Sequence, residues 1–363
     1  MNRRKALKLA GGGGLAAILA TGTAPAYSQG KKEWRLQQTW AKTSPGLAVG
    51  GNAFADYITK ATGGSLSVKV YSAGEIVPPF QTLEAVANGT IQMGYGYVTY
   101  WAGQLPAMNF LGTLPFGLTC QEQNAWYAHG GGNALAEKLY TKLGVKFMLG
   151  GQTPVQPAGW YNKEIKLIGD YKGLKMRVGG LGAKVLQAMG GTPVSMPLGE
   201  VPQAMQSGAI DAIEFVGPLN DLSFGLHKVA KFYYWPGWLE PSGPYDIMIN
   251  PKAWATLSVT EQEIVKAGAA VAMKANIDEM WAKNATAYNQ LTGELKVQVR
   301  QIPDDTIRLI ADQAYKVCEA EAGKDADSKE VWASVMKFRK DILPYMKVSE
   351  YDFMRIRELV KFG

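Results

Sequence analysis

The strongest constraint on the fold of this chain is an order of strand, helix and strand that begins near residue 33. Apolar and polar residues alternate in EWRLQQT (33–39) and again in LSVKVY (66–71), and the stretch from Gly46 to Thr62 between them has helical spacing. Parallel sheets are built from this order, because a crossover connection has to return the chain to the start of the next strand. We therefore predict an α/β protein.

A weak internal repeat indicates that this unit occurs twice. The two copies, which align at a constant offset, are AVANGTIQMGYGY (85–97) and AMQSGAIDAIEFV (204–216). Each copy reads as a helix that ends at a glycine, Gly89 or Gly208, and is followed by a strand. The alignment pairs Tyr95 with Glu214 and predicts that each copy extends a polar group from the carboxyl end of a strand, where open α/β sheets bind ligands. With 363 residues, the chain is long enough for two such lobes.

The remaining patterns complete this α/β body and add an α-rich end. Ser258 and Glu261 form a capping-box pattern, which predicts the start of a long helix, and the helices of this end are expected to brace the two lobes or to make a dimer contact. The predicted strands are 174–178 and 193–196, and the predicted helices are 183–189, 261–291, 304–322, 329–342 and 350–361.

Residues 1–28 have the pattern of a secretory signal peptide, with a basic head, a short apolar middle and small residues before the cleavage position. Adjacent Arg3 and Arg4 favour a twin-arginine signal over an ordinary Sec signal. The apolar part is shorter than the roughly 20 residues that cross a bilayer, so we expect a soluble mature protein in the periplasm. In that oxidising compartment Cys120 and Cys318 could pair, but two separate core residues fit their spacing equally well and are preferred.

The composition and motifs argue against two function classes. Most of the formal charge of +7 belongs to the signal peptide, and no run of Lys and Arg with interleaved aromatic residues is present, so nucleic-acid binding is set aside. The chain has two histidines, His129 and His227, and neither lies at a metal-ligand or acid-base spacing. Without a nucleophile elbow, a zinc-protease motif or a phosphate-binding loop, catalysis is disfavoured.

Polar residues in apolar, glycine-rich surroundings at predicted strand ends are the candidates for a binding site. They are Tyr97, Tyr100, Gln156, Arg177, Glu214 and Glu240. A buried charge needs a partner, and the forked guanidinium of Arg177 presents paired donors at the spacing of a small carboxylate. If Glu214 shares that pocket, the site with its ligand carries a net charge of −1. A protonated Glu214, a Glu214–Arg177 pair or a cation would resolve this, and Na⁺ would bring the sum to zero. An all-oxygen shell of Glu214, Gln156 and main-chain carbonyls suits hard cations.

Several of these segments resemble those of a known family, the DctP-type solute-binding proteins of tripartite ATP-independent periplasmic (TRAP) transporters. The resemblance covers essentially the whole mature chain and is strongest to the branch that binds 2-oxo acids with sodium, which is related to one that binds lactate with calcium. The matching segments are SAGEIVPPFQTLEAVANGTI, WYAHGGGN, AGWYNKEI, GLKMRVGGLGAKV, GAIDAIEFVGP and YYWPGWLEPSGP.

The resemblance implies roles for individual residues. Arg177 is implied to bind the substrate carboxylate, and the side chains of Gln156 and Glu214 to bind the cation together with the main chain of Phe215. That position is usually Trp in the branch, so the pocket wall here lacks an indole. Tyr100, Tyr97 and Glu240 are implied as pocket residues, and Na⁺ as the cation, with Ca²⁺ as the alternative.

The resemblance also implies the domain organisation, a type II-like periplasmic binding protein with two lobes and a hinge. Lobe I is expected over 29–154, with part of 244–300 returning to it, and lobe II over 155–243, with part of 301–340. Residues 341–363 are expected to form a C-terminal helix that is exchanged between the partners of a homodimer. The implied partners are a small carboxylate and the membrane subunits of a TRAP transporter.

Other functions stay open at this point. A receptor for a four-carbon dicarboxylate would need a second positive group, for which Lys184 and Arg35 are the candidates. A periplasmic lyase or hydrolase could use Glu214 as a general base with a metal-bound water, although the lack of suitably spaced histidines and of a second acid argues against it. A scaffold without a ligand would leave Arg177 and Glu214 unexplained. The identity of the 2-oxo or 2-hydroxy acid is a packing question that the sequence does not answer.

Overall fold

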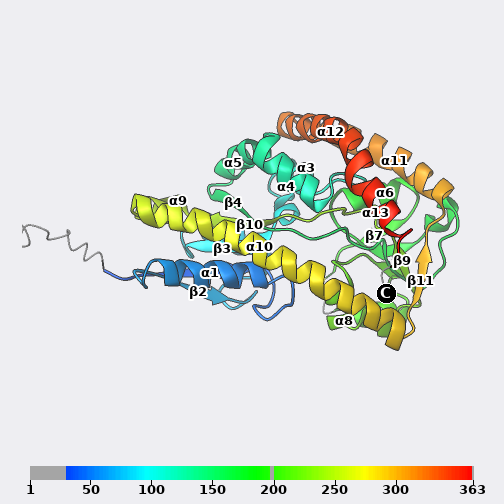
Figure 1. Ribbon diagram of the computed structural model, residues 1–363, viewed down its shortest axis with the longest axis horizontal. Coiled ribbons are helices and arrows are strands. Elements are labelled where there is room, and N and C mark those ends of the chain that lie inside the picture. Colours follow the sequence, from blue (N-terminus) through cyan, green and yellow to red (C-terminus); the bar gives the residue numbers. More distant parts are fainter. Residues whose placement is uncertain (1–29, 197–199, 362–363) are drawn as a thin grey trace, which may run out of the picture.

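The computed structural model describes residues 30–196 and 200–361 (Figure 1). The predicted signal peptide, residues 1–28, lies outside the described residues.

Two sheets organise the described residues, and we call the parts built on them lobe I and lobe II. The sheet of lobe I has the order β2-β1-β3-β10-β4, in which β1 pairs in parallel with β2 and β3, while β10 is antiparallel to β3 and β4. Its strands are β1 (Lys32–Gln38), β2 (Leu66–Tyr71), β3 (Met93–Tyr97), β4 (Lys146–Gly151) and β10 (Tyr245–Ile249). Because β10 comes from far along the chain, lobe I is built from two separate stretches of sequence.

The sheet of lobe II has the order β11-β9-β5-β8-β6-β7. Its strands are β5 (Gly159–Tyr161), β6 (Lys175–Arg177), β7 (Thr192–Val194), β8 (Ala212–Ile213), β9 (Phe232–Trp235) and β11 (Gln298–Gln301). Strand β6 pairs in parallel with β7 and β8, whereas β5 is antiparallel to β8 and β9. The predicted α/β fold with two lobes is confirmed.

Helices cover both sheets (Figure 1). Those that follow the strands of lobe I are α1 (Val49–Ala61), α2 (Thr82–Ala87), α3 (Met108–Gly112), α4 (Cys120–His129) and α5 (Gly132–Lys142), with short 3₁₀ turns η1 (Pro79–Gln81) and η2 (Val98–Trp101). Those of lobe II are α6 (Gly180–Ala188), α7 (Val201–Ser207) and α8 (Pro218–Ser223), with η3 (Ile168–Tyr171) and η5 (Leu226–Lys228). The α-rich end consists of α9 (Pro251–Ala255), α10 (Val259–Asn289), η6 (Gln290–Glu294), α11 (Asp304–Ala322), α12 (Ala326–Met346), η7 (Lys347–Tyr351) and α13 (Asp352–Arg357).

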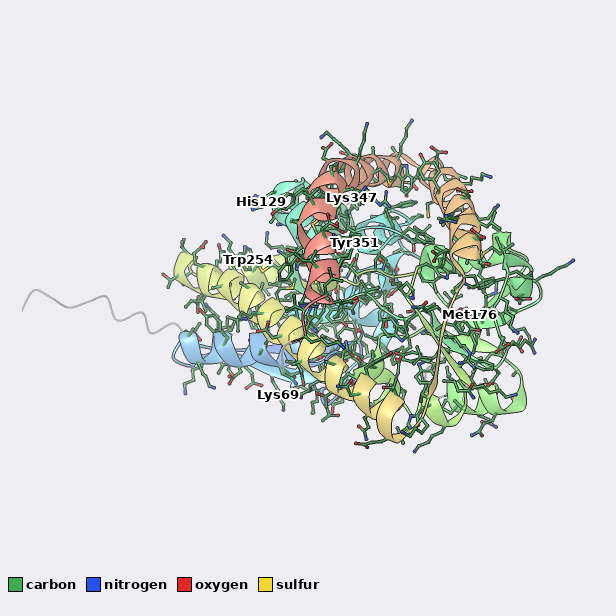
Figure 2. The ribbon with its side chains drawn as sticks, turned by 45° about the vertical axis from the view of Figure 1, so that its right-hand side comes forward. Lys69, His129, Met176, Trp254, Lys347 and Tyr351 are labelled. Atoms are coloured by element: carbon green, nitrogen blue, oxygen red, sulfur yellow. The ribbon has the colours of Figure 1, made fainter. Side chains whose placement is uncertain are left out.

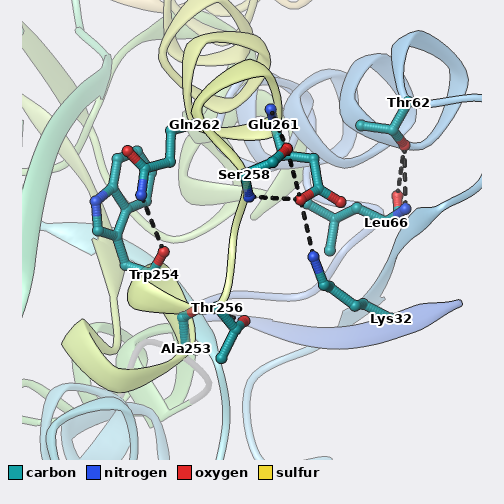
Figure 3. A network of polar contacts seen from close by, with 9 residues as sticks. All are labelled: Lys32, Thr62, Leu66, Ala253, Trp254, Thr256, Ser258, Glu261 and Gln262. Atoms are coloured by element: carbon teal, nitrogen blue, oxygen red, sulfur yellow. Dashed lines mark hydrogen bonds and ion pairs between the residues drawn. The ribbon is translucent and has the colours of Figure 1, made fainter. Parts of the chain in front are cut away.

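Helix α10 begins at the capping box that the sequence predicts (Figure 3). The Glu261 amide donates to the Ser258 hydroxyl at 3.2 Å, the Ser258 amide donates to the Glu261 carboxylate at 2.8 Å, and Lys32 of β1 donates to the same carboxylate oxygen at 2.8 Å. From there α10 runs without a break along α1 and β4 of lobe I and on to α8 of lobe II (Figure 1). The predicted long helix that braces both lobes is therefore present.

Two antiparallel segments connect the lobes side by side and form the hinge. Residues 152–158 lead from β4 to β5, and residues 236–244 lead from β9 to β10. Main-chain hydrogen bonds join them, from Thr153 to Gly243 at 3.0 Å and from Gln156 to Glu240 at 3.1 Å. Their contact is so close that a Cβ atom on Gly237 would lie 1.9 Å from the Gln156 carbonyl oxygen, so only glycine fits there.

The internal repeat is confirmed at its glycines and wrong at one of its polar residues. Gly89 and Gly208 follow α2 and α7 with φ of +84° and +72°, as the left-handed position after a helix requires. Tyr95, however, lies within β3 instead of at its end, is fully buried, and donates to the Gly150 carbonyl at 3.0 Å. The reason is strand length. Pairing with β10 keeps β3 extended as far as Tyr97, whereas β8 ends at Ile213.

The two cysteines, Cys120 at the start of α4 and Cys318 in α11, are buried and free, as preferred from the sequence.

The core of lobe I contains a buried carboxyl group whose charge is costly. Asp246 of β10 is fully buried and accepts hydrogen bonds from the Trp101 indole and the Tyr140 hydroxyl, while its Oδ1 has no partner. Burial raises the pKa of Asp246 from 3.8 to about 6, against the lowering effect of those hydrogen bonds. Because the folded state holds this proton more tightly than the unfolded state, the contribution of Asp246 to stability falls as pH rises from 4 through 6.

We expect Asp246→Asn to remove this pH dependence. Relative to the unmodified protein, the free energy of unfolding of the variant should rise by about 3 kcal/mol between pH 4 and pH 7, measured by urea unfolding at intervals of one pH unit. The matched control is Asp56→Asn, since the Asp56 side chain is largely exposed in its ion pair with Lys60. A difference between Asp246→Asn and the unmodified protein that stays constant with pH would contradict the assignment.

Candidate functional site

The site is built where two parallel strands of lobe II end side by side. Arg177 is the last residue of β6 and Glu214 is the first residue after β8, its neighbour in the sheet. The Glu214 amide donates to the Arg177 carbonyl at 3.1 Å, and the Arg177 guanidinium donates back to the Glu214 carbonyl at 3.4 Å. The carboxyl ends of parallel strands meet at one edge of a sheet, so the guanidinium and the carboxylate belong to the same site.

The hinge contributes the next two polar groups. Gln156 and Glu240 lie on its two segments, and the Gln156 amide nitrogen donates to Glu240 Oε2 at 2.9 Å and to Thr153 Oγ1 at 3.2 Å. Since both bonds come from the amide nitrogen, the amide oxygen of Gln156 is the atom left to accept a donor or a cation. Thr153, which sequence reasoning did not single out, helps to set this orientation.

Lobe I completes the site with two tyrosines. The Tyr97 hydroxyl, at the end of β3, donates to Glu240 Oε2 at 2.6 Å. Tyr100 of η2 packs edge-on against the Tyr97 ring at 5.3 Å and against the exposed Phe80 ring at 5.2 Å. Burial raises the pKa of Tyr100, the positive charge of Arg177 lowers it, and the negative charges of Glu240 and Glu214 raise it further, so the phenol is influenced by the charged groups of the site.

Phe215 contributes its main chain to this edge of the sheet, but not its ring. The ring is 6% exposed and lies in the apolar cluster of lobe II, where it packs edge-on against Phe224 at 5.0 Å. The carbonyl of Phe215, adjacent to Glu214, is the atom that can serve as a ligand.

Residues of both lobes meet beside Glu240. A cavity of about 10 Å³ there is lined from lobe I by Thr99 and Thr113 and from lobe II by Val178 and residues 179–182. A space of this size holds about one water molecule.

The electrostatics of the site favour an added positive charge. Burial raises the pKa of Glu214 well above its usual value, the negative charge of Glu240 raises it further, and Arg177 lowers it. Burial also raises the pKa of Glu240, while hydrogen bonds from Tyr97 and Gln156 and the charge of Arg177 lower it. With both carboxylates ionised, these three charged groups sum to −1 before any ligand arrives. The charge balance drawn from sequence left Glu240 out.

The oxygen atoms present fit a hard cation. Glu214 Oε1 is buried and has no hydrogen-bond partner among the described residues, which is costly unless a cation or a proton satisfies it. The Gln156 amide oxygen and the Phe215 carbonyl, the latter implied by the family resemblance, are the further predicted ligands, and both are oxygens of the kind that hard cations prefer. In residues 30–196 and 200–361, no group of three or more His, Cys, Asp or Glu side chains could hold a metal ion. A cation at this site would therefore depend on amide and main-chain oxygens.

The two candidates for a second positive group lie in other contacts. Lys184 pairs with Glu321 of α11 at 3.1 Å, and the Arg35 guanidinium donates to the Thr90 carbonyl. The single guanidinium of Arg177 matches a ligand with one carboxylate better than a ligand with two.

Two α/β lobes, a double-stranded hinge and a charged site enclosed between them define a solute-binding protein of the periplasmic type. More closely, the chain belongs to the DctP family, described as bacterial extracellular solute-binding protein, family 7, whose model matches residues 37–321. Members of this family are the solute receptors of TRAP transporters, which confirms the predicted family and class of function. No helix in the described part of the chain is long and apolar enough to cross a membrane.

Several known proteins are similar over almost the whole chain. The monocarboxylate 2-oxoacid-binding periplasmic protein of Nostoc is 37% identical over 322 residues, which is 88% of this chain and 87% of that protein. The structure of a TRAP periplasmic solute-binding protein from Pseudoalteromonas atlantica with bound sodium and pyruvate is 30% identical, with a TM-score of 0.86, and covers 90% of this chain and 99% of that one. A TRAP protein from Colwellia psychrerythraea with bound calcium and pyruvate is 31% identical, with the same TM-score and the same coverage.

Proposed function

We propose that this protein captures a small monocarboxylate, a 2-oxo acid such as pyruvate or a 2-hydroxy acid such as lactate, together with a cation in the periplasm. It then closes around the ligand and delivers it to the membrane subunits of a TRAP transporter. The observation that carries the proposal is the pairing of Arg177, which can hold a carboxylate, with the unpartnered Oε1 of Glu214 at adjacent strand ends. The ligands named for the similar proteins support it. The site acts by orientation and charge pairing, without covalent chemistry.

We propose Na⁺ as the cation, with Ca²⁺ as the alternative. The charges of the site determine which protonation state of the glutamates each cation requires for a neutral site. A bound monocarboxylate brings the sum of Arg177, Glu214 and Glu240 to −2. Calcium would neutralise it. Sodium would do so if one of the two glutamates keeps its proton, which the raised pKa values of both favour.

A thermal-shift panel tests ligand and cation together, because a ligand that binds the native state raises its melting temperature. Pyruvate, lactate, a branched 2-oxo acid and succinate are each added to chelated protein, with Na⁺ alone or with Ca²⁺. A shift with the monocarboxylates is expected. A shift with succinate alone would support the dicarboxylate receptor instead, and consumption of any acid, followed by NMR, would support an enzyme.

We further propose that residues 1–28 are removed on export. N-terminal sequencing of the periplasmic protein checks this, and an intact N-terminus would contradict it.

We also propose that the C-terminal segment, residues 347–361, packs against a second copy of the chain. It extends from α12 and has contacts mainly with α12 and within itself, and Figure 2 labels Lys347 and Tyr351 on it. Its apolar side chains are exposed, an arrangement that favours a partner. The exposed residues are Val348, Tyr351, Phe353, Met354, Ile356, Leu359 and Val360.

Removing residues 347–363 is expected to convert a dimer into a monomer. Light scattering after size-exclusion chromatography measures the mass directly. Tyr351→Asp with Leu359→Asp should have the same effect without truncation, whereas Lys347→Asp serves as the control for an added acid on the same segment. If the full-length protein is monomeric at a concentration of about 100 µM, the proposal is contradicted.

A further inference from the structure

A short segment joins the proposed cation ligands to a contact with the other lobe. Strand β8 ends at Ile213, the loop 214–217 carries Glu214 and the Phe215 carbonyl, and helix α8 follows at once from Pro218 to Ser223. In this loop Val216 packs against apolar clusters of both lobes. Only two residues, Val216 and Gly217, therefore separate the proposed cation ligands from α8.

Asp221 of α8 fixes this segment to lobe II. It is fully buried and accepts hydrogen bonds from the Trp160 indole at 2.8 Å, the Tyr233 hydroxyl at 2.7 Å and the Gly217 amide at 3.2 Å. The Trp160 and Tyr233 rings stack at 4.0 Å on the two neighbouring strands β5 and β9. Loop and helix are thus tied to the sheet of lobe II and move with it.

The adjacent residue, Asn220, reaches lobe I. Its side-chain nitrogen donates to the Pro45 carbonyl at 2.9 Å, in the loop between β1 and α1. Asn220 is fully buried, and its Oδ1 has no hydrogen-bond partner within the part of the chain that the structure describes. Closing the lobes therefore gives this amide one bond across the interface and removes its oxygen from water.

Helix α10 supports both sides of this contact from one face. Asn276 donates to the Gly46 carbonyl at 2.8 Å and accepts from the Gln152 amide at 2.7 Å, both in lobe I or at its exit. Two turns further on, Asn284 accepts from the Leu219 amide of α8 at 2.9 Å. Asn276 and Asn284 are eight residues apart and therefore lie on the same side of α10. From that side α10 holds both the Pro45–Gly46 loop and α8 in place.

We propose that Asn220 is a latch that sets ligand affinity by stabilising the closed state, without touching the ligand. This inference rests on the proposed function, in which the lobes open and close around a solute. A bond that exists only in the closed state adds its free energy to the closing equilibrium, and the apparent affinity follows the population of the closed state. Because Asp221 and Asn220 are adjacent, the latch moves with the loop that carries Glu214 and Phe215.

The first test compares Asn220→Ala and Asn220→Asp with Asn162→Ala. Asn162 is the matched control, since its side-chain nitrogen also donates to main-chain carbonyls, at 3.4 Å and 3.3 Å, but both belong to lobe II. For Asn220→Ala, the Kd of pyruvate in the presence of cation should rise about 3- to 10-fold through faster dissociation. Asn220→Asp should raise it further, because a carboxylate oxygen would face the Pro45 carbonyl. The melting temperature without ligand should be unchanged in both.

A merely structural role would give another pattern. Asn162→Ala is expected to lower the melting temperature with and without pyruvate by the same amount and to leave Kd within about twofold. If Asn220→Ala behaves like this control, the latch is overturned.

A second test does not depend on the ligand's identity. In a protein carrying Pro45→Cys and Asn220→Cys, disulfide formation under mild oxidation reports how often the two residues meet. The native Cys120 and Cys318 are both buried, which limits their interference. Slow cross-linking without ligand and at least about 5-fold faster cross-linking with pyruvate is expected, in proportion to the closed population. Complete cross-linking at the same rapid rate in both conditions would show a permanent contact and overturn the latch. If the protein does not bind pyruvate, the proposed ligand is wrong. Slow cross-linking would then still show that the contact between positions 45 and 220 opens.

Discussion

Replacing Arg177 by alanine is expected to raise the Kd of pyruvate by more than about 100-fold while leaving the fold intact. Removing one partner of a buried charge pair costs about 3–5 kcal/mol, because the ligand carboxylate is left without a counter-charge in a closed site. Arg177 lies at the end of β6, and among residues 30–196 and 200–361 its guanidinium makes one hydrogen bond, a long one to the Glu214 carbonyl, so its loss should disturb the sheet little. Isothermal titration calorimetry measures the affinity, and circular dichroism checks the fold.

The controls for this variant separate charge from geometry. Arg177→Lys keeps the charge and loses the fork, so an intermediate affinity is expected. Arg300→Ala removes an arginine of the same lobe, whose guanidinium lies over the Phe232 ring at 5.3 Å, and should leave the Kd unchanged. Near-normal affinity in Arg177→Ala would show that the carboxylate binds elsewhere.

The second large effect concerns the cation. In the unmodified protein, removing Na⁺ and Ca²⁺ should weaken pyruvate binding by about 100-fold or more, because two glutamates and a bound carboxylate then face a single guanidinium. Glu214→Gln keeps the shape of the side chain and removes one negative charge. We expect this variant to respond to added cation by less than about threefold, and to bind pyruvate more tightly than the unmodified protein when no cation is present.

This reversal distinguishes a cation ligand from a structural residue. A general loss of packing at position 214 would weaken binding with and without cation alike. Glu164→Gln is the matched control, since Glu164 is a lobe II glutamate that pairs with Lys166 at the surface, and it should keep the full cation response. Calorimetry measures the Kd of pyruvate for each protein after exhaustive chelation and again with Na⁺ or Ca²⁺ added back. An unmodified protein that binds equally well in chelated, Na⁺-free buffer would remove the cation from the site.

The sequence predicts one half of this site better than the other, and the reason is local structure. Arg177 ends β6 and Glu214 follows β8, and these two strands are parallel neighbours, so the adjacency of the two residues follows from topology. Gln156 and Glu240 come from irregular hinge segments 84 residues apart, and nothing in either segment indicates that the two side chains meet. Their contact is a consequence of how two crossings of the chain between the lobes, at residues 152–158 and 236–244, lie side by side.

Two errors have the same kind of cause. Tyr95 was expected at a strand end, but strand length depends on pairing with β10, which lies far away in sequence. The charge balance around Glu214 was short by one carboxylate, because the position of Glu240 depends on the same long-range crossing. The start of α10, by contrast, depends on local sequence, since a capping box begins the helix. The predicted helix, 261–291, is within two residues of α10 at each end.

The hinge has a further consequence for the order of events when a solute arrives. Gln156 and Glu240 lie on the two hinge segments, and Arg177 and Glu214 lie at neighbouring strand ends of lobe II, so we expect these four groups to keep similar mutual distances in the open and the closed state. If the proposed function holds, a solute is expected to meet this half-site first and to be enclosed by Tyr97 and Tyr100 afterwards. Substitutions of those tyrosines should chiefly change how long a solute stays, and only weakly how fast it enters. In this arrangement, substitutions in lobe I can change which solute side chain is preferred, while the four charged and polar groups of the half-site stay the same.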